Sequence, residues 1–103
     1  MVPRVEHARS FLARARGLLF RTRIEPDLAL VLWKTYSIHM FGMLFSIDVV
    51  FLDSDRTVLA LYPNRRPFSL PVGAWGASFA VEAAPGTIER AGLAIGDRLF
   101  WPD

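Results

Sequence analysis

The clearest alternation of side chains along the chain runs from Phe45 to Asp53. Up to position 51 the odd-numbered residues of this segment are apolar and would share one face of a strand, while the other face includes Asp48. Because both faces are mainly apolar, the pattern predicts a strand in the centre of a sheet. Residues 53–56 have the composition of a tight turn, so residues 57–62 are predicted to form the partner strand of a hairpin.

Four other short segments have the composition of strands, because apolar residues form short runs or alternate with polar ones. They are Leu28–Trp33, Ser37–Phe41, Ala77–Glu82 and Arg98–Trp101. The segment from Pro63 to Pro71 is rich in proline and arginine. It predicts a loop without regular structure up to about Ala74.

Two segments predict helices. Apolar residues recur every three or four positions from Ser10 to Phe20, as on one face of an N-terminal helix. A shorter helix is predicted from Thr87 to Ala91, where Thr87 can cap the first turn and Gly92 can end the last. These elements predict an α+β fold with a mainly antiparallel sheet, for which a barrel-like closure is one possible arrangement.

Size and composition favour one folded unit. The chain has 103 residues, which is near the commonest size of a domain, so we expect a single domain over residues 1–103. Hydrophobic residues make up 52% of it, which is enough for a packed core. Cysteine is absent, and this excludes disulfides, thiolate metal sites and cysteine nucleophiles.

The charge is weak overall and uneven along the chain. The net charge is +2, and six of the eleven arginines lie in the first 23 residues. Such a segment can bind phosphate groups, an anionic membrane surface or an acidic partner, or it can pair with carboxylates downstream. No apolar stretch has the length of a signal peptide or a membrane-spanning helix, so we expect a cytoplasmic protein with no transmembrane segment.

Three segments together resemble a known family. They are ARGLLFR at residues 15–21, HMFGMLFSIDVVFLD at residues 39–53, and residues 84–98 with their APGT, AGL and GDR motifs. In this order and spacing they resemble the uncharacterised family called domain of unknown function 192, over about residues 10–100. The resemblance implies a compact α+β fold of mainly β structure, in a family of bacterial and archaeal proteins. We take this member to be bacterial. It implies no established activity.

Asp48 is the first candidate for chemistry. A carboxylate inside an apolar strand loses its hydration, so it needs a hydrogen-bonded or charged partner. The first of the three family segments supplies Arg16 and Arg21 as candidates for that partner. A structural role, as a buried ion pair or as a carboxylate bound by backbone amides, and a catalytic role as an acid or base are both open.

His39 is the second candidate. In a strand it would share a face with Met43, which could bring an imidazole and a thioether together as ligands for copper. A copper-binding protein would use His39, Met40 and Met43, whereas an enzyme would pair His39 with Asp48 as acid and base. A structural histidine is the simpler interpretation. Since no His, Asp and Glu residues have the spacing of a metal site, we predict no metal and no other cofactor.

Arg65, Arg66 and Trp75 are the third candidate. Basic and aromatic side chains in one loop can neutralise and stack on single-stranded nucleic acid, but solvated loops often have the same composition. We therefore do not expect a nucleic-acid partner. Glycine motifs for phosphate binding and the usual motif of a serine nucleophile are absent from the sequence.

These candidates favour a non-enzymatic binding or accessory module. Its ligand would be a peptide, another protein or an anionic small molecule. The site would form around His39, Asp48 and the first helix with Arg16 and Arg21, and the proline-rich loop would be a lid or contact surface. A small enzyme that uses Asp48 and His39, and a copper-binding protein, are the alternatives.

Overall fold

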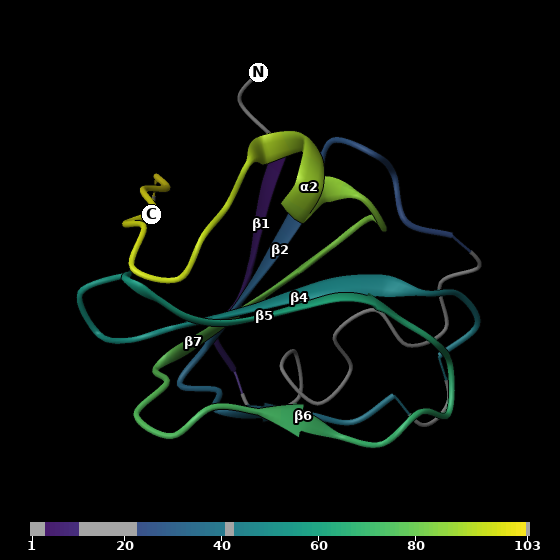
Figure 1. Cartoon of the computed structure of the whole chain (residues 1–103), viewed down its shortest axis with the longest axis horizontal. Coiled ribbons are helices and arrows are strands. Elements are labelled where there is room, and N and C mark those ends of the chain that lie inside the picture. Colours follow the sequence, from purple (N-terminus) through teal and green to yellow (C-terminus); the bar gives the residue numbers. More distant parts are fainter. Residues whose placement is uncertain (1–3, 11–22, 41–42, 103) are drawn as a thin grey trace.

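The computed structural model describes residues 4–10, 23–40 and 43–102, which form layers (Figure 1). A five-stranded sheet lies in the middle, with a two-stranded sheet on one side and a short helix on the other. In spatial order the five strands are β1 (Arg4–Ala8), β2 (Leu28–Trp33), β7 (Phe79–Ala83), β4 (Ile47–Leu52) and β5 (Val58–Arg65). The smaller sheet pairs β3 (Ser37–Ile38) with β6 (Val72–Gly73), and the helix is α2 (Thr87–Ala91).

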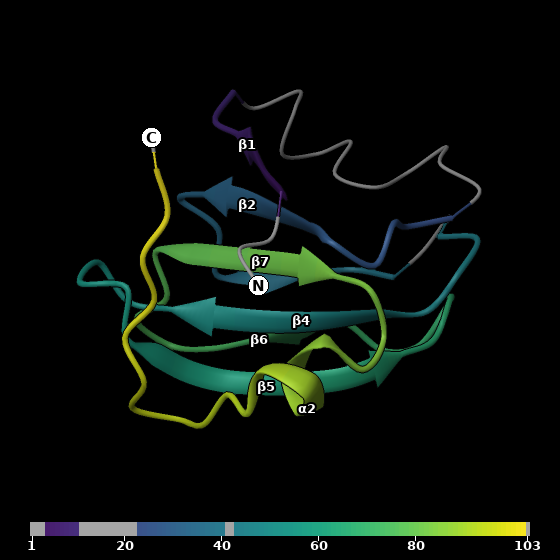
Figure 2. The ribbon, with the colours of Figure 1, turned by 90° about the horizontal axis from the view of Figure 1, so that it is seen from above.

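Strand β4 lies inside the sheet, as its alternation predicts. It pairs antiparallel with β7 on one side and with β5 on the other (Figure 2). All of its residues are buried. Ile47, Val49 and Phe51 belong to one core, and Val50 and Leu52 belong to the other. The predicted central strand and its hairpin with β5 are therefore confirmed.

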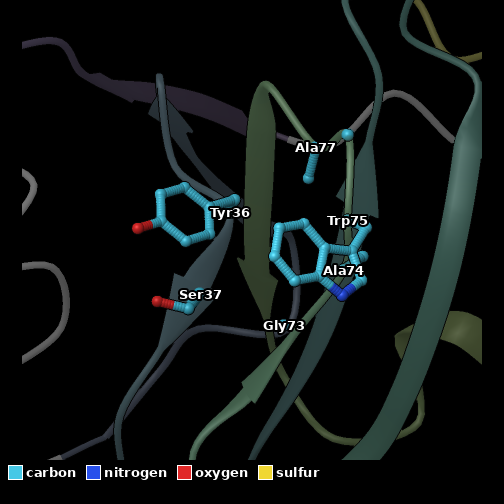
Figure 3. Close-up of a pocket in the computed structure, with 7 residues that line it drawn as sticks. Tyr36, Ser37, Gly73, Ala74, Trp75 and Ala77 are labelled. Atoms are coloured by element: carbon cyan, nitrogen blue, oxygen red, sulfur yellow. The ribbon is translucent and has the colours of Figure 1, made fainter.

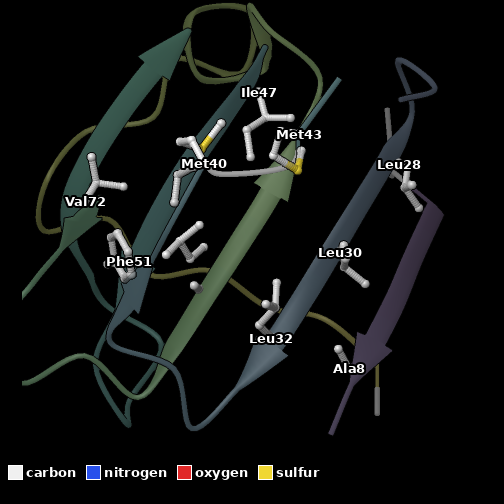
Figure 4. Packing of buried hydrophobic residues seen from close by; sticks show 12 residues of the cluster. Ala8, Leu28, Leu30, Leu32, Met40, Met43, Ile47, Phe51 and Val72 are labelled. Atoms are coloured by element: carbon white, nitrogen blue, oxygen red, sulfur yellow. The ribbon is translucent and has the colours of Figure 1, made fainter. Parts of the chain in front are cut away.

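The two cores lie on opposite faces of the five-stranded sheet. The first joins this sheet to the β3–β6 layer, which contributes Ile38 and Val72 (Figure 4). The second joins it to α2 and the C-terminal segment, through Ile88 and Trp101. Because strands buried on both faces have few polar positions, this arrangement explains the nearly continuous apolar sequences of β2 and β4.

The sheet is mixed because of β1, which the sequence pattern does not predict. Strand β1 pairs in parallel with β2, whereas the other three pairings of the sheet are antiparallel, as predicted. Only Ala8 is fully buried in β1, so the segment lacks an apolar run that would mark it as a strand. Among the described strands, β1 and β5 lie at opposite ends of the order, and the sheet is not closed. The barrel-like arrangement is therefore wrong.

Two further differences lie between residues 63 and 73. Strand β5 continues to Arg65, beyond its predicted end at Tyr62. Pro63 is tolerated there because β5 is an edge strand, where a missing N–H leaves no neighbouring carbonyl unbonded. Strand β6 lies inside the predicted loop, and with two residues it is too short for any periodic pattern to show.

The C-terminal segment does not form the predicted strand over residues 98–101. In the described part of the chain it makes one bridge, between Thr57 and Arg98. Arg56 holds the segment instead, because its guanidinium donates to the carbonyl of Trp101 at 3.1 Å and lies 4.2 Å from the centre of the indole ring. Two backbone hydrogen bonds also hold the segment, from Val58 N–H to the carbonyl of Asp97 at 2.7 Å and from Leu99 N–H to the carbonyl of Arg56 at 2.9 Å. This cation over an aromatic face adds to them where a full strand ladder was expected.

His7 joins the first strand to this C-terminal segment. The indole N–H of Trp33 donates to Nδ1 of His7 at 3.0 Å. Nε2 lies 2.7 Å from the carbonyl oxygen of Pro102, so the tautomer that satisfies both contacts carries its proton on Nε2. The two ends of the described chain are thereby held at the same edge of the domain.

The short helix is confirmed, although it begins differently. Gly86, with a φ of 90°, precedes its first turn, and the Thr87 hydroxyl donates to the carbonyl of Ala84 at 2.6 Å instead of capping the helix. Gly92 ends the helix as predicted. The N-terminal helix predicted from Ser10 to Phe20 lies outside the described residues after its first position. Among the helices that the structure describes, none is long and apolar enough to cross a membrane.

Candidate functional site

The side chain of Asp48 links two parts of the chain by hydrogen bonds. Its side chain lies in β4 and is 1% exposed. One carboxylate oxygen accepts the backbone N–H of Asn64 at 2.8 Å, and the other accepts the backbone N–H of Ile88 at 2.9 Å. Bonds from backbone amides are one of the two structural roles that the sequence leaves open. Arg16 and Arg21 lie outside the described residues, so an ion pair with either stays a prediction.

The bond to Asn64 explains a local distortion of the hairpin. The register between β4 and β5 shifts between Ile47 and Val49, which places Asp48 opposite a bulge. Asn64 has a φ of 50°, in the left-handed region that asparagine tolerates better than most residues. Asp48 stabilises this bulge and the first turn of α2 together.

His39 does not form a site with the residues expected beside it. Its side chain is exposed, whereas Met40 and Met43 are buried in the first core. The two thioethers therefore point into the protein and the imidazole lies at the surface. Asp48 is buried as well, with both oxygens bound to amides. Within the described ranges, no group of three or more His, Asp or Glu residues could hold a metal ion.

A hollow in the β3–β6 layer has the shape of a binding site. It has a volume of about 440 Å³ and is lined by Tyr36, Ser37, Gly73, Ala74, Trp75, Gly76 and Ala77. Figure 3 shows the rings of Tyr36 and Trp75 on opposite sides of it. The volume lies in the range of sites for small ligands, roughly 300–1,000 Å³. The walls are aromatic and the floor consists of small residues.

Gly73 allows the two strands beneath the hollow to approach closely. A Cβ atom at this position would lie 2.7 Å from the backbone oxygen of Tyr36, a distance that a side chain cannot adopt. The same oxygen accepts the N–H of Ala74 at 3.1 Å. Glycine is therefore required where β6 leads into the hollow.

Trp75 lies at the tip of a tight turn. The N–H of Ala77 donates to the carbonyl of Ala74 at 3.3 Å, and Gly76 has a φ of 81°, as in the third residue of a type II turn. This turn leaves the Trp75 side chain 100% exposed. A tryptophan that contributes nothing to the core is unusual, because its large apolar surface is normally buried.

The floor of the hollow is attached to the first core by Tyr62. Its hydroxyl donates to the carbonyl of Gly73 at 2.7 Å. Its ring packs edge-on against Phe51, with ring centres 5.9 Å apart. The fully buried Phe51 thus supports the tyrosine that supports the hollow.

Removing the Tyr62 hydroxyl tests this attachment. Tyr62→Phe is expected to lower the free energy of unfolding by about 1 kcal/mol, because one hydrogen bond to a partly buried carbonyl is lost. Urea denaturation measures the loss, and hydrogen exchange should accelerate at the amides of residues 73–77. Tyr36→Phe removes an exposed hydroxyl and is the matched control, with an expected change below about 0.5 kcal/mol. Equal effects of the two substitutions would contradict the attachment.

The loop before β6 presents further apolar and basic side chains. Phe68 and Leu70 are 65% and 80% exposed. Arg65 donates from Nη2 to the carbonyl of Leu70 at 3.1 Å and so braces this loop, while Arg66 is exposed. Of the residues proposed from sequence, Trp75 therefore lines the hollow, whereas Arg65 and Arg66 lie outside its lining. Arg65 pairs with Ile47, at the other end of β4 from Leu52, to which Ser78 is bonded.

Sequence reasoning missed the other residues of the hollow. No sequence pattern identifies Tyr36 as a site residue, because its position depends on the pairing of two short strands. One signal for the hollow was present in the sequence, because small residues stand on both sides of a tryptophan and leave its ring uncovered. They are Gly73 and Ala74 before Trp75 and Gly76 after it. The burial of Glu82, which is 4% exposed in β7, was also missed.

The fold and the hollow define a class of protein: a small domain with an open mixed sheet, two cores, and an aromatic-walled hollow on a two-stranded layer. Residues 2–101 match the model of domain of unknown function 192, which is described as Uncharacterized ACR. The chain belongs to this family, as the resemblance of its three segments indicates.

Relatives of the chain occur in archaea and in bacteria. A UPF0127 protein from Thermococcus sibiricus is 39% identical over 95% of this chain, which spans 66% of that relative. A UPF0127 protein from Pyrococcus abyssi is 33% identical over 95% of this chain and 86% of the relative. A crystal structure of a protein of unknown function from Novosphingobium aromaticivorans superimposes with a TM-score of 0.86 at 27% identity, over 96% of this chain and 75% of that chain. The archaeal relatives contradict the expectation of a bacterial protein.

Proposed function

We propose that this domain is a non-enzymatic binding module that accepts an apolar side chain of a partner polypeptide between Tyr36 and Trp75. The exposed ring of Trp75 across the hollow from Tyr36 is the observation that carries this proposal. Exposed aromatic side chains are common anchors at protein interfaces, since they bury a large area when a partner covers them.

The support beneath the hollow also favours binding. Gly73 and Tyr62 hold the floor to the core, and the turn around Gly76 fixes the backbone of Trp75. A site that is already formed loses little conformational entropy when a ligand enters it. The backbone beneath the hollow is therefore ordered before a ligand enters, and the fully exposed ring of Trp75 is free to pack against that ligand.

The residues proposed as an acid and base give less support to an enzyme. General acid–base catalysis needs its groups within hydrogen-bond reach of the reacting atoms. Both oxygens of Asp48 accept backbone amides in the interior, and His39 lies at the surface outside the lining of the hollow. A binding role uses the exposed residues of the hollow and leaves Asp48 its structural role.

Selection of displayed random peptides against the whole chain tests the proposed function. Selected peptides are expected to share an aromatic or aliphatic residue, and Trp75→Ala is expected to weaken their binding at least ~10-fold, as for an anchor residue at an interface. Because the Trp75 side chain is fully exposed, the variant should unfold at the same urea concentration as the unmodified protein.

Phe100→Ala is the matched control, because Phe100 is exposed on the C-terminal segment, outside the hollow. This variant should bind the selected peptides within about twofold of the unmodified protein, as expected for a residue outside the contact. Peptides that tolerate Trp75→Ala, or a selection that enriches no peptide, would contradict the proposed function.

A further inference from the structure

The lining of the hollow is uncharged. None of its residues is an Asp, Glu, Lys, Arg or His. Its polar side-chain groups are the hydroxyls of Tyr36 and Ser37 and the indole N–H of Trp75, and the rest of the lining is glycine and alanine. A charged group that entered the hollow would lose hydration without gaining an opposite charge. The part of a ligand that enters is therefore expected to be neutral as well.

The polar side-chain groups of the hollow are available to donate hydrogen bonds to a ligand. Tyr36 and Trp75 are 65% and 100% exposed, and Ser37 is exposed as well. In the part of the chain that the structure describes, their hydroxyls and indole N–H have no hydrogen-bond partner. An indole N–H can only donate, whereas a hydroxyl can donate or accept. These side chains therefore favour a ligand that presents carbonyl groups.

The backbone of the lining already uses several of its acceptors. The carbonyl of Tyr36 accepts the N–H of Ala74 at 3.1 Å, and the carbonyl of Ala74 accepts the N–H of Ala77 at 3.3 Å. The carbonyl of Gly73 accepts the hydroxyl of Tyr62 at 2.7 Å. A ligand that buries its own N–H without an acceptor loses affinity, because the N–H gives up its bond to water. The hollow therefore favours a ligand residue that has no N–H.

The sheet beneath the hollow is too short to bind a partner as an added strand. Strands β3 and β6 have two residues each, and the chain turns at Gly76 soon after β6. Strand addition takes its affinity from a ladder of backbone hydrogen bonds along a sheet edge. Figure 3 shows instead two rings on opposite sides of an open space. A peptide in the hollow would therefore be held by the rings and the donors beside them.

We infer that the hollow binds a proline-rich segment in the polyproline II conformation, with a proline ring between Tyr36 and Trp75. This inference rests on the proposed function and names the class of its ligand. Proline has an apolar ring and no N–H, so it brings no donor that needs an acceptor. A polyproline II segment has no internal hydrogen bonds, so its carbonyls can accept from the free donors of the hollow. Because the segment is already ordered, it also loses little entropy on binding between aromatic rings.

Three labelled peptides with common Ser-Gly flanks test the inference. The first has a centre of four prolines, the second has the centre Ala-Leu-Ala-Leu, and the third has a single trimethyllysine between alanines. Fluorescence anisotropy with the whole chain should give the proline peptide an affinity at least ~5-fold above that of the leucine peptide. Raising NaCl from ~50 to ~500 mM should change the affinity for the proline peptide less than about twofold, because the contact involves no charge.

The trimethyllysine peptide represents the other ligand that paired aromatic rings hold, a quaternary ammonium group. It should bind no more tightly than the leucine peptide, because the lining has no carboxylate to offset the loss of hydration. A higher affinity for trimethyllysine than for either other peptide would mean that the hollow selects a cation. That result would overturn the inference and the proposed function together.

Removing single donors locates the peptide in the hollow. Trp75→Phe keeps an aromatic ring without the indole N–H, and Tyr36→Phe keeps the ring without the hydroxyl. Each should weaken the proline peptide about threefold or more, because a hydrogen bond to a ligand carbonyl is lost. Both positions are exposed, so both variants should unfold at the urea concentration of the unmodified protein. Phe100→Ala, outside the hollow, should leave the affinity within about twofold.

The outcomes separate the inference from the proposed function. If the leucine peptide binds as tightly as the proline peptide, and Trp75→Ala abolishes binding, the inference is wrong and the proposed function stands. The same holds if neither Trp75→Phe nor Tyr36→Phe weakens the proline peptide while Trp75→Ala does. If no peptide binds, the proposed function fails as well.

Discussion

Replacing Asp48 with asparagine is expected to lower the free energy of unfolding by about 2–4 kcal/mol. The carboxylate accepts two backbone amides, from Asn64 and Ile88, with no solvent to replace it. Asparagine keeps one carbonyl oxygen and presents an NH₂ group where the second oxygen was, so one buried amide would face another donor. Urea denaturation followed by far-ultraviolet circular dichroism measures the loss.

Asp55→Asn is the matched control, because Asp55 is exposed in the turn between β4 and β5. It should change the free energy of unfolding by less than about 0.5 kcal/mol, as surface substitutions usually do. Hydrogen exchange should accelerate at the amides of Asn64 and Ile88 in the Asp48 variant. A variant with the stability of the unmodified protein would show that these amides do not depend on the carboxylate.

Replacing Phe51 with alanine is expected to lower the free energy of unfolding by about 3–5 kcal/mol, the usual cost of deleting a buried aromatic ring. Phe51 is fully buried in the central strand, and its ring packs against Tyr62. The cavity would lie directly behind the tyrosine that holds Gly73. Denaturation in urea measures the loss, and binding of peptides to the hollow should weaken under conditions in which the variant is still folded.

Phe100→Ala makes the same chemical change at a position that is 80% exposed. Its effect should stay below about 0.5 kcal/mol, since little packing is lost at the surface. Phe51→Leu should fall between the two, at about 1–1.5 kcal/mol, because leucine refills most of the volume. A small effect of Phe51→Ala would contradict the central position of this ring in the first core.

The parts of the fold predicted from sequence are those with strong local patterns. Strands β2 and β4 and helix α2 have apolar runs, alternation or glycine stops that lie within the element itself. Strands β1 and β6 do not, because β1 is a partly buried edge strand without an apolar run and β6 has only two residues. Each is formed by pairing with a segment more than twenty residues away, and such pairing leaves no periodic signal in the sequence.

The candidate site was predicted less completely, for a similar reason. The burial of Asp48 follows from its apolar neighbours, whereas its partners are amides of Asn64 and Ile88, and any residue type can supply an amide. Trp75 and the two arginines of the loop were named from composition. The hollow itself depends on the close approach of Gly73 to Tyr36, which only the pairing of β3 with β6 establishes.

The two hydrogen bonds from the Asp48 carboxylate to the backbone also affect how the parts of the domain depend on one another. One oxygen holds the bulge from which β5 leads into the loop and β6, and the other holds α2 on the opposite side of the five-stranded sheet. A helix of five residues has little stability of its own, and neither has a sheet of two-residue strands. One buried carboxylate thus bonds to segments on both sides of the sheet, so we expect its loss to loosen the β5 bulge and α2 together.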